Sequence, residues 1–287
     1  MILLDGKKVR DEISAKLRAR ISTFSSKPKL VIVQIGDNEE SATYIRQKKL
    51  FGESIGALVE HMKLRPDISE TDLLSTIQQL NNDNTIHGVI VQMPIPPHID
   101  KGTVVDAIAM DKDVDGLGSG NVKALWENTQ GLVPATTKGI LSLLSEYKIP
   151  VAGKHVVVVG RSSLVGKPTA QALINADATV TVAHSKTPNL PEVTRTGDIL
   201  VVAAGKPHFI QRDHVREGQV VIDVGITAVT GEKLDDEVPE KTITGDVHFD
   251  AVKDIVAAIS PVPGGVGPMT VASLFQNLVS AYERQQS

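Results

Sequence analysis

The fold of this chain is decided by the stretch Val156-Val157-Val158-Val159-Gly160-Arg161-Ser162-Ser163-Leu164-Val165-Gly166-Lys167-Pro168. The valine run predicts a buried strand, and the glycine after it predicts a tight turn into a helix. In such a turn, backbone N–H groups and a helix N-terminus face the pyrophosphate of a dinucleotide. The stretch is not a Walker A loop, because five residues separate Gly160 from Gly166 and Pro168 replaces the required Ser or Thr. The alternative to a dinucleotide site is an ordinary strand–helix turn.

The same alternation of strand and helix continues along most of the chain. Short aliphatic runs that predict further strands lie at 30–35, 88–93, 179–183, 199–204 and 220–224. Uninterrupted β-branched runs are typical of strands covered by helices on both faces of a parallel sheet. Between the strands, an apolar stripe at 9–21 and a capping box beginning at Ser69 predict helices. The sequence therefore predicts an α/β fold built from βαβ units.

A turn-rich segment at 146–153 separates two series of strands. We expect an N-terminal α/β lobe of residues 1–145, completed by a C-terminal helix at 270–287, and a Rossmann-like lobe of residues 146–269. The length of 287 residues suits two lobes of ordinary size. A cleft between the lobes is the expected ligand site.

The composition excludes several classes of protein. Hydrophobic residues make up 41% of the chain and charged residues 22%, as in an ordinary globular protein. With 30 basic and 34 acidic residues the formal net charge is −4, so we expect no nucleic-acid partner. Cysteine is absent, and the eight histidines lack ligand spacing, so we expect no metal site. No signal peptide or membrane span is expected either, which makes a soluble cytoplasmic protein the default.

Residues around the glycine turn and after the next strand bear on the choice of dinucleotide. Ser162 takes the place of the second glycine of the usual G-x-G-x-x-G motif. An NAD site carries an acid about 20 residues further on, where it binds the ribose 2′-hydroxyl. Here the strand at 179–183 leads into His184-Ser185-Lys186-Thr187, with no acid. The hydroxyl of Ser185 and the guanidinium of Arg161 suit a 2′-phosphate, which favours NADP. The alternative is that Ser185 only caps the strand end.

Two later glycines, Gly205 and Gly225, each follow a predicted strand. Ligands bind at this end of the strands in open α/β sheets, so both turns suit the same site. Each is equally compatible with a plain turn.

Three features of the N-terminal half carry candidate chemistry. Tyr44 and Lys48 are four residues apart on a predicted helix and therefore share one face. Gln92 lies inside an aliphatic run, where a buried amide needs hydrogen-bond partners. Lys112-Asp113-Val114-Asp115-Gly116 places two carboxylates in one turn. The plain alternatives are a solvated lysine beside a half-buried tyrosine, a core glutamine bonded to backbone, and a solvated Asx-turn.

Five segments in a fixed order carry a family resemblance. They are Tyr44-x-x-x-Lys48, Val91-Gln92-Met93-Pro94-Ile95-Pro96, Lys112-Asp113-Val114-Asp115-Gly116, Gly160-Arg161-Ser162-x-x-Val165-Gly166-x-Pro168 and Pro261-Val262-Pro263-Gly264-Gly265-Val266-Gly267-Pro268-Met269-Thr270. With them the chain resembles, over almost its whole length, the bifunctional methylenetetrahydrofolate dehydrogenase/methenyltetrahydrofolate cyclohydrolase family. It departs from the family at Pro134-Ala135-Thr136-Thr137, where Pro-Cys-Thr-Pro is frequent, so Thr137 lacks the fixed φ of proline.

The resemblance implies two lobes joined by two long helices, NADP on the C-terminal lobe, a folate cleft between the lobes, and a homodimer. The implied reactions belong to one-carbon metabolism and purine biosynthesis. An oxidoreductase step converts 5,10-methylenetetrahydrofolate to the methenyl form with NADP⁺, and a hydrolase step yields 10-formyltetrahydrofolate. The implied folate-side residues are Tyr44, Lys48, Val91, Gln92, Met93, Asp115, Pro263, Gly264, Gly265 and Thr270. The implied NADP-side residues are Gly160, Arg161, Ser162, Ser185 and Ile226.

The four expected catalytic residues suit these reactions. We expect Lys48 to be the acid/base of the hydrolysis, because burial and the adjacent folate cation lower its pKa. Gln92 orients Lys48 without charging it, Tyr44 stacks on the substrate rings, and Asp115 accepts hydrogen bonds from the pterin N–H edge. Hydride transfer needs mainly positioning.

Two rival functions stay open. One is a monofunctional NADP dehydrogenase for another small substrate, against which the pairing of Lys48 with Gln92 argues. The other is a non-catalytic NADP-binding regulator, against which the presence of Lys48 and Asp115 argues.

Overall fold

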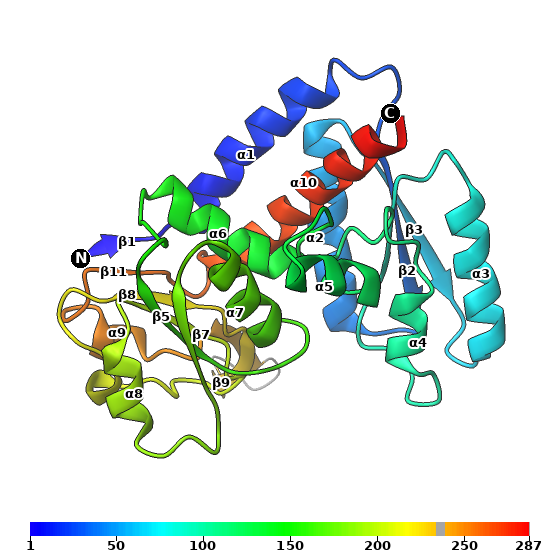
Figure 1. The fold of residues 1–287 in the computed structure, drawn as a ribbon. Coiled ribbons are helices and arrows are strands. Elements are labelled where there is room, and N and C mark those ends of the chain that lie inside the picture. The colour runs from blue at the N-terminus through cyan, green and yellow to red at the C-terminus, as the bar shows by residue number, and fades with distance from the viewer. Residues whose placement is uncertain (234–238, 287) are drawn as a thin grey trace. The chain divides into compact units, whose positions relative to one another are not determined.

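Two parallel sheets carry the fold (Figure 1). The computed structural model describes residues 1–233 and 239–286. One compact unit comprises residues 11–135 and 271–287 and is called here the three-stranded unit after its sheet. The other comprises residues 1–10 and 136–270 and is called the six-stranded unit. The predicted α/β class with two lobes is confirmed.

The division between the units falls inside two long helices, α1 (Gly6–Ile21) and α10 (Val266–Gln286). It also falls at the first residue of α6 (Ala135–Glu146). The sequence analysis placed this boundary after residue 145, and so assigned most of α6 to the N-terminal lobe. In the structure, residues 136–146 of α6 belong to the six-stranded unit. The N-terminal residues belong to the six-stranded unit because β1 (Ile2–Leu3) pairs with β11 (Ala258–Ile259) of that sheet.

The three-stranded unit has the strand order β3-β2-β4, all parallel. Its elements between α1 and α6 are β2 (Lys29–Ile35), α2 (Glu39–Ile55), β3 (Leu58–Leu64), α3 (Glu70–Asn82), β4 (Gly88–Val91), α4 (Lys101–Asp106) and α5 (Ser119–Trp126). The predicted strands at 30–35 and 88–93 are confirmed, although β4 ends two residues earlier. The predicted helix start is confirmed, since α3 begins directly after Ser69, whose side chain accepts a hydrogen bond from the N–H of Asp72. Only half of the predicted capping box is present among the described hydrogen bonds, because the carboxylate of Asp72 accepts from Ser69 Oγ and not from the Ser69 N–H.

Helices cover both faces of this sheet. On one face, Val31, Val33 and Val89 pack in a core cluster with Leu73 and Ile77 of α3. On the other face lie α2 and α10, whose Phe51 and Phe275 rings approach to 5.3 Å between centroids. This two-sided burial is what a continuous run of β-branched residues requires.

The six-stranded unit is a parallel sheet with the strand order β1-β11-β8-β7-β5-β6. Its elements after α6 are β5 (His155–Val159), α7 (Gly166–Asn175), β6 (Thr179–Ala183), α8 (Leu190–Thr196), β7 (Ile199–Val202), the 3₁₀ turn η1 (Arg212–His214), β8 (Val220–Asp223), β9 (Thr227–Lys233), β10 (Pro239–Thr244), α9 (Phe249–Val252) and β11. From β5 the chain runs outward to β6 and then returns past β5 to β7. The strand order therefore reverses between β5 and β7, which makes the carboxyl ends of these strands the topological switch point.

Strand β6 departs from the expectation of burial on both faces. It is the edge strand of the sheet, and among its residues only Ala183 is fully buried. Val182 exposes 40% of its surface. The aliphatic pattern thus identified the strand but not its place at the edge, because an edge strand with threonines reads much like a central one.

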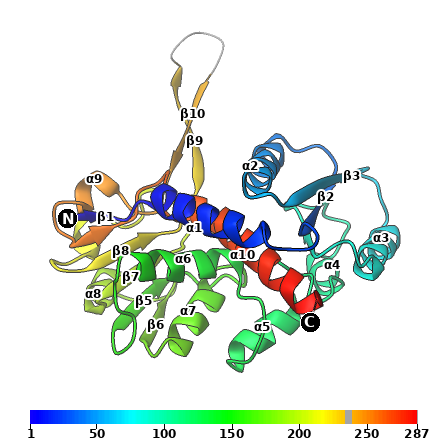
Figure 2. The same ribbon diagram turned by 90° about the horizontal axis from the view of Figure 1, so that it is seen from above.

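Five strands of the described residues escaped the sequence analysis: the two-residue strands β1 and β11, and three longer ones. In β3, apolar residues alternate with Glu60, His61 and Lys63, and most of its side chains are only half-buried. β9 and β10 form an antiparallel hairpin that projects from the six-stranded unit (Figure 2). All three are polar enough to resemble loops when helices and buried strands are sought.

Candidate active site

The half-buried amine of Lys48 faces the side-chain amide of Gln92. Lys48 lies on α2, and its Nζ donates a hydrogen bond of 2.8 Å to Gln92 Oε1. Gln92 follows the last residue of β4, and its Nε2 donates to the carbonyl of Met93 at 2.9 Å. Because the backbone occupies Nε2, the oxygen of the amide is the atom turned toward Lys48. The predicted pairing of these two residues is therefore present in the structure, and Lys48 is not a solvated surface lysine.

Burial lowers the pKa of Lys48, and the negative charge of Asp115 opposes this effect. Burial in turn raises the pKa of Asp115, while the charge of Lys48 lowers it. Two further charges act on Asp115: Asp113 raises its pKa and Lys101, at the start of α4, lowers it. The geometry thus gathers a poorly solvated amine, a neutral amide and a carboxylate, the set of groups that proton transfer near neutral pH requires.

Asp113 shapes the turn that carries Asp115. Its carboxylate is buried and accepts hydrogen bonds from the backbone N–H of Gly116 at 3.0 Å and Gly118 at 2.8 Å. It also accepts one from Nδ2 of Asn121 at 3.0 Å. The solvated Asx-turn considered from the sequence is therefore wrong for Asp113, whose side chain organises the turn from inside.

Residues that the sequence analysis missed hold the same turn from two other sides. Nδ2 of Asn277, on α10, donates to the carbonyls of Val114 at 2.9 Å and Val133 at 2.8 Å. The buried amine of Lys112 donates to the carbonyls of Asn81 and Asp83 at the end of α3, at 2.7 and 2.8 Å. No motif announces these contacts, because they join segments far apart in the sequence.

The other predicted folate-side residues divide between the units. Tyr44 lies one helical turn before Lys48 and exposes 40% of its surface. Val91 is buried at the end of β4, and the carbonyl of Met93 accepts a second hydrogen bond from Ser41 Oγ at 3.1 Å. These three lie in the unit that holds Lys48.

The segment 261–270 belongs to the six-stranded unit. Pro263 is exposed, whereas Gly264 and Gly265 are buried. The carbonyl of Gly264 accepts a hydrogen bond of 2.9 Å from the N–H of Gly6. Thr270 Oγ1 donates to Thr136 Oγ1 at 3.4 Å.

The predicted dinucleotide turn lies at the switch point of the six-stranded sheet. Gly160 follows β5 directly and has a φ of +123°, a conformation that side chains disfavour. A Cβ on Gly160 would lie 2.1 Å from the carbonyl oxygen of Ala203, and one on Gly166 would lie 2.3 Å from the carbonyl oxygen of Gly160. Neither glycine could carry a side chain without displacing backbone. A turn without side chains at these two positions suits a pyrophosphate at the N-terminus of α7.

The remaining cofactor-side candidates lie in the same unit as this turn. Ser162 Oγ accepts hydrogen bonds from the N–H groups of Val165 and Gly166 at 3.2 and 3.3 Å, so its side chain stabilises the turn itself. Arg161 and Ser185 are exposed, and the turn after β6 holds no acid. Ile226 exposes 46% of its surface and lies near Gly267, 3.5 Å from where its Cβ would be. These residues fit a dinucleotide with a 2′-phosphate.

Thr137, the departure from the family pattern, is fully buried. Its Oγ1 forms a hydrogen bond of 3.0 Å with Oγ1 of Thr169 on α7. A hydroxyl contact between α6 and α7 thus takes the place of a proline ring.

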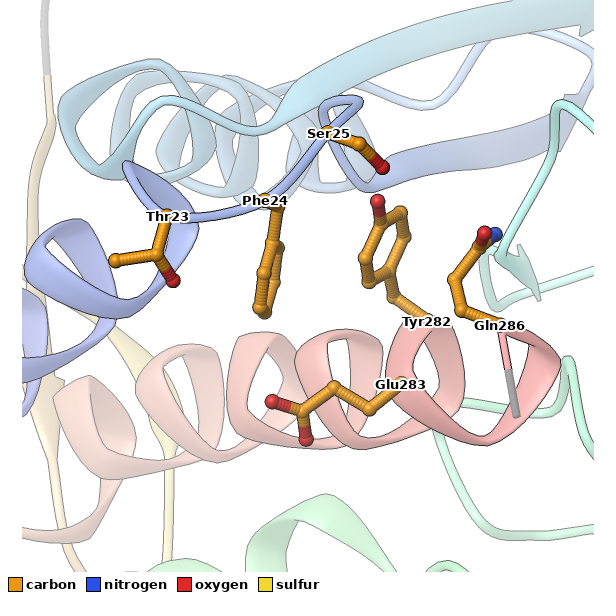
Figure 3. A pocket seen from close by; sticks show the side chains of 6 residues that line it. All are labelled: Thr23, Phe24, Ser25, Tyr282, Glu283 and Gln286. Carbon is orange, nitrogen blue, oxygen red and sulfur yellow. The ribbon is translucent and has the colours of Figure 1, made fainter.

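A surface cavity of about 500 Å³ lies elsewhere in the three-stranded unit (Figure 3). It is lined by Thr23, Phe24, Ser25, Tyr282, Glu283 and Gln286. The ring of Tyr282 stacks on Phe24 at 4.6 Å, and its hydroxyl contacts Ser26 Oγ at 3.0 Å. These contacts secure the end of α10, and the cavity includes none of the candidate site residues.

Within the part of the chain that the structure describes, residues 1–233 and 239–286, no three His, Cys, Asp or Glu side chains gather as a metal site requires. None of its helices combines the length and apolar character of a membrane span.

The fold and these contacts define a class: an α/β protein of two units, with nucleotide-binding topology in one and a lysine–amide–carboxylate cluster in the other. Comparison with known proteins is more specific. Residues 4–115 match the catalytic domain of tetrahydrofolate dehydrogenase/cyclohydrolase, and residues 134–286 match the NAD(P)-binding domain of the same enzyme.

Full-length relatives agree with the domain matches. The bifunctional protein FolD of Latilactobacillus sakei is 44% identical over 282 residues, which are 97% of this chain and 96% of the relative. The crystal structure of bifunctional FolD from Campylobacter jejuni is 38% identical, covers 99% of both chains and superposes with a TM-score of 0.93. That of Trypanosoma brucei FolD, solved with NADP and an inhibitor, is 34% identical, covers 99% and 98% of the two chains and has a TM-score of 0.92. The chain belongs to the tetrahydrofolate dehydrogenase/cyclohydrolase family, which confirms the resemblance.

Asp223, the last residue of β8, should make the stability of the folded chain depend on pH. Burial raises its pKa from 3.8 to about 6, although three backbone N–H groups donate to it. A carboxyl whose pKa is higher in the folded than in the unfolded state holds its proton more tightly when folded. The free energy of unfolding therefore falls as pH rises from the unfolded-state pKa to the folded-state pKa. The interval from 3.8 to about 6 corresponds to roughly 3 kcal/mol.

We therefore expect the stability of the wild type to fall relative to that of Asp223→Asn as pH rises from about 4 to about 7, by up to roughly 3 kcal/mol, whatever the offset between the two proteins at low pH. Urea unfolding of both proteins at several pH values measures this difference. Asp250→Asn is the control, because Asp250 is exposed and its hydrogen bond with Lys253 lowers its pKa. A stability difference for Asp223→Asn that stays constant over this range contradicts the assignment.

Proposed function

We propose that this chain oxidises 5,10-methylenetetrahydrofolate to 5,10-methenyltetrahydrofolate with NADP⁺ and hydrolyses the product to 10-formyltetrahydrofolate. It is an oxidoreductase and a hydrolase of one-carbon metabolism. The observation that carries the proposal is the hydrogen bond of 2.8 Å from Lys48 Nζ to Gln92 Oε1, within the field of Asp115. A dehydrogenase alone has no need of such a proton-transfer group, which disfavours the monofunctional alternative. A non-catalytic regulator has no need of it either.

The oxidation requires mainly orientation from the protein. The nitrogens on either side of the methylene carbon stabilise the cation that remains when hydride leaves it. NADP⁺ supplies the hydride acceptor. Tyr44, exposed one turn from Lys48, is suited to stack on the substrate rings. Asp115 is suited to accept two hydrogen bonds from the N–H edge of the pterin, which fixes the ring.

The hydrolysis requires a proton to move twice. Water attacks the methenyl carbon, and the neutral amine of Lys48 takes a proton from it. The resulting ammonium then donates that proton to N5 as the bond between N5 and the carbon breaks. The remaining hydroxyl proton is released to solvent as the C=O bond forms, so the formyl group stays on N10 and the cationic substrate gives a neutral product and one proton. Burial of Lys48 makes its neutral form accessible, and Gln92 Oε1 holds the amine without adding charge. A carboxylate in place of Gln92 would keep Lys48 protonated.

The six-stranded unit binds NADP in this proposal. Backbone N–H groups of the turn at Gly160 face the pyrophosphate, and Ser162 stabilises that turn through its contacts with Val165 and Gly166. Arg161 and Ser185 hold the 2′-phosphate, because a guanidinium and a hydroxyl replace the acid of an NAD site. Ile226 adds an apolar contact beside Gly267.

We expect Lys48→Met to lower the cyclohydrolase rate by roughly 10²-fold or more, the scale for loss of a general acid/base. Methionine keeps much of the length and the apolar stem but cannot carry a proton. The dehydrogenase rate should fall less, because Tyr44, Asp115 and the NADP site remain. Initial rates of both reactions, measured on one preparation, decide this.

Lys49→Met is the matched control, since it removes a neighbouring lysine of the same helix that makes no contact with Gln92 or Asp115 among the described hydrogen bonds. A cyclohydrolase rate near that of the wild type in Lys48→Met shows that Lys48 is not the shuttle. Loss of both activities together with folate binding shows that Lys48 is a binding residue.

Arg161→Ala should raise the KM for NADP⁺ by about tenfold or more and change that for NAD⁺ much less. A charge-assisted contact with the 2′-phosphate, absent from NAD⁺, is worth roughly 1.5–3 kcal/mol. Steady-state dehydrogenase kinetics with both dinucleotides measure the effect. Lys154→Ala removes a cation just before the amino end of β5, whereas Arg161 follows the carboxyl end of that strand, and serves as control. An equal rise in both KM values refutes the assignment of Arg161.

A cytoplasmic homodimer completes the proposal. The edge strand β6, with its exposed Val182, offers an aliphatic surface and unpaired backbone groups to a second copy. We expect sedimentation at micromolar concentration to give twice the chain mass of 30.7 kDa. Val182→Lys should shift the protein toward the monomer, because it places two like charges at the interface. A wild-type monomer at this concentration contradicts the dimer.

A further inference from the structure

Asp246 is a fully buried carboxylate that the reactions above do not use. It accepts hydrogen bonds from three consecutive backbone N–H groups in the loop that follows β7. Oδ2 accepts from Ala204 at 2.6 Å and from Gly205 at 2.8 Å, and Oδ1 accepts from Lys206 at 2.8 Å. A row of N–H groups converging in this way is a common binding site for anions. Here an internal carboxylate occupies it.

This contact changes the interpretation of the loop at 203–206. The sequence places Gly205 after a strand, at the end of the sheet where ligands bind, so that its turn suits the dinucleotide site or a plain turn. Since Asp246 already accepts hydrogen bonds from these N–H groups, they are not available to a pyrophosphate, and the loop contributes by contacting other parts of the site. The surface that it supports is the glycine turn, because the carbonyl oxygen of Ala203 lies 2.1 Å from where a Cβ of Gly160 would be.

Asp223 fixes Asp246 in turn. Its carboxylate accepts hydrogen bonds from the N–H groups of Gly225 at 2.9 Å, Asp246 at 3.0 Å and Val247 at 2.9 Å. Gly225 and Asp246 flank the two ends of the β9–β10 hairpin, which Asp223 therefore joins at its base (Figure 2). The N–H of Asp223 donates to Ser260 Oγ at 2.8 Å.

We propose that Asp246, held in place by Asp223, is a positioning residue for the dinucleotide: it fixes the loop at 203–206, on which the Gly160 turn rests, and so sets the affinity for NADP. The connection runs from β8 through Asp223, Asp246 and Ala203 to Gly160, all within the six-stranded unit. It rests on the proposed function, because it presumes that NADP binds at the Gly160 turn.

A purely structural role for Asp246 predicts a different outcome from a positioning role. Loss of general stability lowers every activity of the chain together. Loss of loop geometry weakens NADP binding and leaves reactions without cofactor intact. Hydrolysis of methenyltetrahydrofolate needs no NADP and relies on Lys48 in the other unit, so it reports on the folding of the whole chain independently.

The test uses Asp246→Asn in the full chain. Asparagine has the same shape, but it offers one acceptor oxygen instead of two and turns an NH₂ group toward backbone donors. We expect the Kd for NADPH, from titration of its fluorescence, and the KM for NADP⁺ to rise roughly tenfold or more. The kcat of the dehydrogenase at saturating NADP⁺ and the cofactor-free hydrolysis should stay within about threefold of the wild type. Asp250→Asn, an exposed acid on α9 of the same unit, is the control and should match the wild type throughout.

A second variant covers the case in which Asp246→Asn does not fold. Gly205 has a φ of +64° with open space around its Cβ position, so Gly205→Ala strains the loop backbone without displacing a neighbour. It should weaken NADPH binding by a few-fold and leave hydrolysis unchanged. Wild-type affinity for NADPH in the folded variants, or equal losses in all activities, overturns the proposal. If the wild type itself does not bind NADPH, the proposed function has failed, which is a distinct result.

Discussion

The proposed chemistry depends on one hydrogen bond, that between Lys48 Nζ and Gln92 Oε1. A lysine in water is a poor base at neutral pH because its pKa is near 10.4. Burial lowers the pKa of Lys48, and a neutral amide holds its amine without restoring the charge. The contact is possible because α2 and β4 bring two residues from distant segments together, and because the carbonyl of Met93 fixes the amide through Nε2. Asp113 and Asn277 hold the turn that carries Asp115, whose charge acts on Lys48.

The six-stranded unit also contains buried ionisable groups, and there backbone hydrogen bonds compensate them. A buried carboxylate is costly unless hydrogen bonds compensate its charge. Asp223 and Asp246 each accept three backbone N–H groups, and the loops that donate them lie at the carboxyl end of the sheet. In both units, therefore, buried charge is placed where it defines the geometry of loops beside a candidate site. The difference is that Lys48, in the proposed mechanism, changes its protonation state, whereas Asp246 only accepts hydrogen bonds.

The sequence predicted what depends on local pattern. β5 and the turn at Gly160 follow from a valine run that ends in glycine, and α3 follows from its cap at Ser69. β3 was missed because its polar residues lie on a half-buried strand, and the edge position of β6 has no local signal. Lys48 and Gln92 were candidates from their helix spacing and aliphatic surroundings, and the order of motifs in the family then predicted their roles. The contributions of Asn277 and Asp246 could not be found, because each depends on contacts between segments that only the folded chain brings together.

The most direct test of this account is the pKa of Lys48 itself. NMR titration of the Nζ signal in the wild type, assigned by its absence from Lys48→Met, measures it in the free protein. We expect a pKa clearly below the ordinary value of 10.5, because burial outweighs the opposing charge of Asp115. A pKa at or above that value would mean that the ammonium is stabilised in its site, and Lys48 could not then serve as the base for hydrolysis.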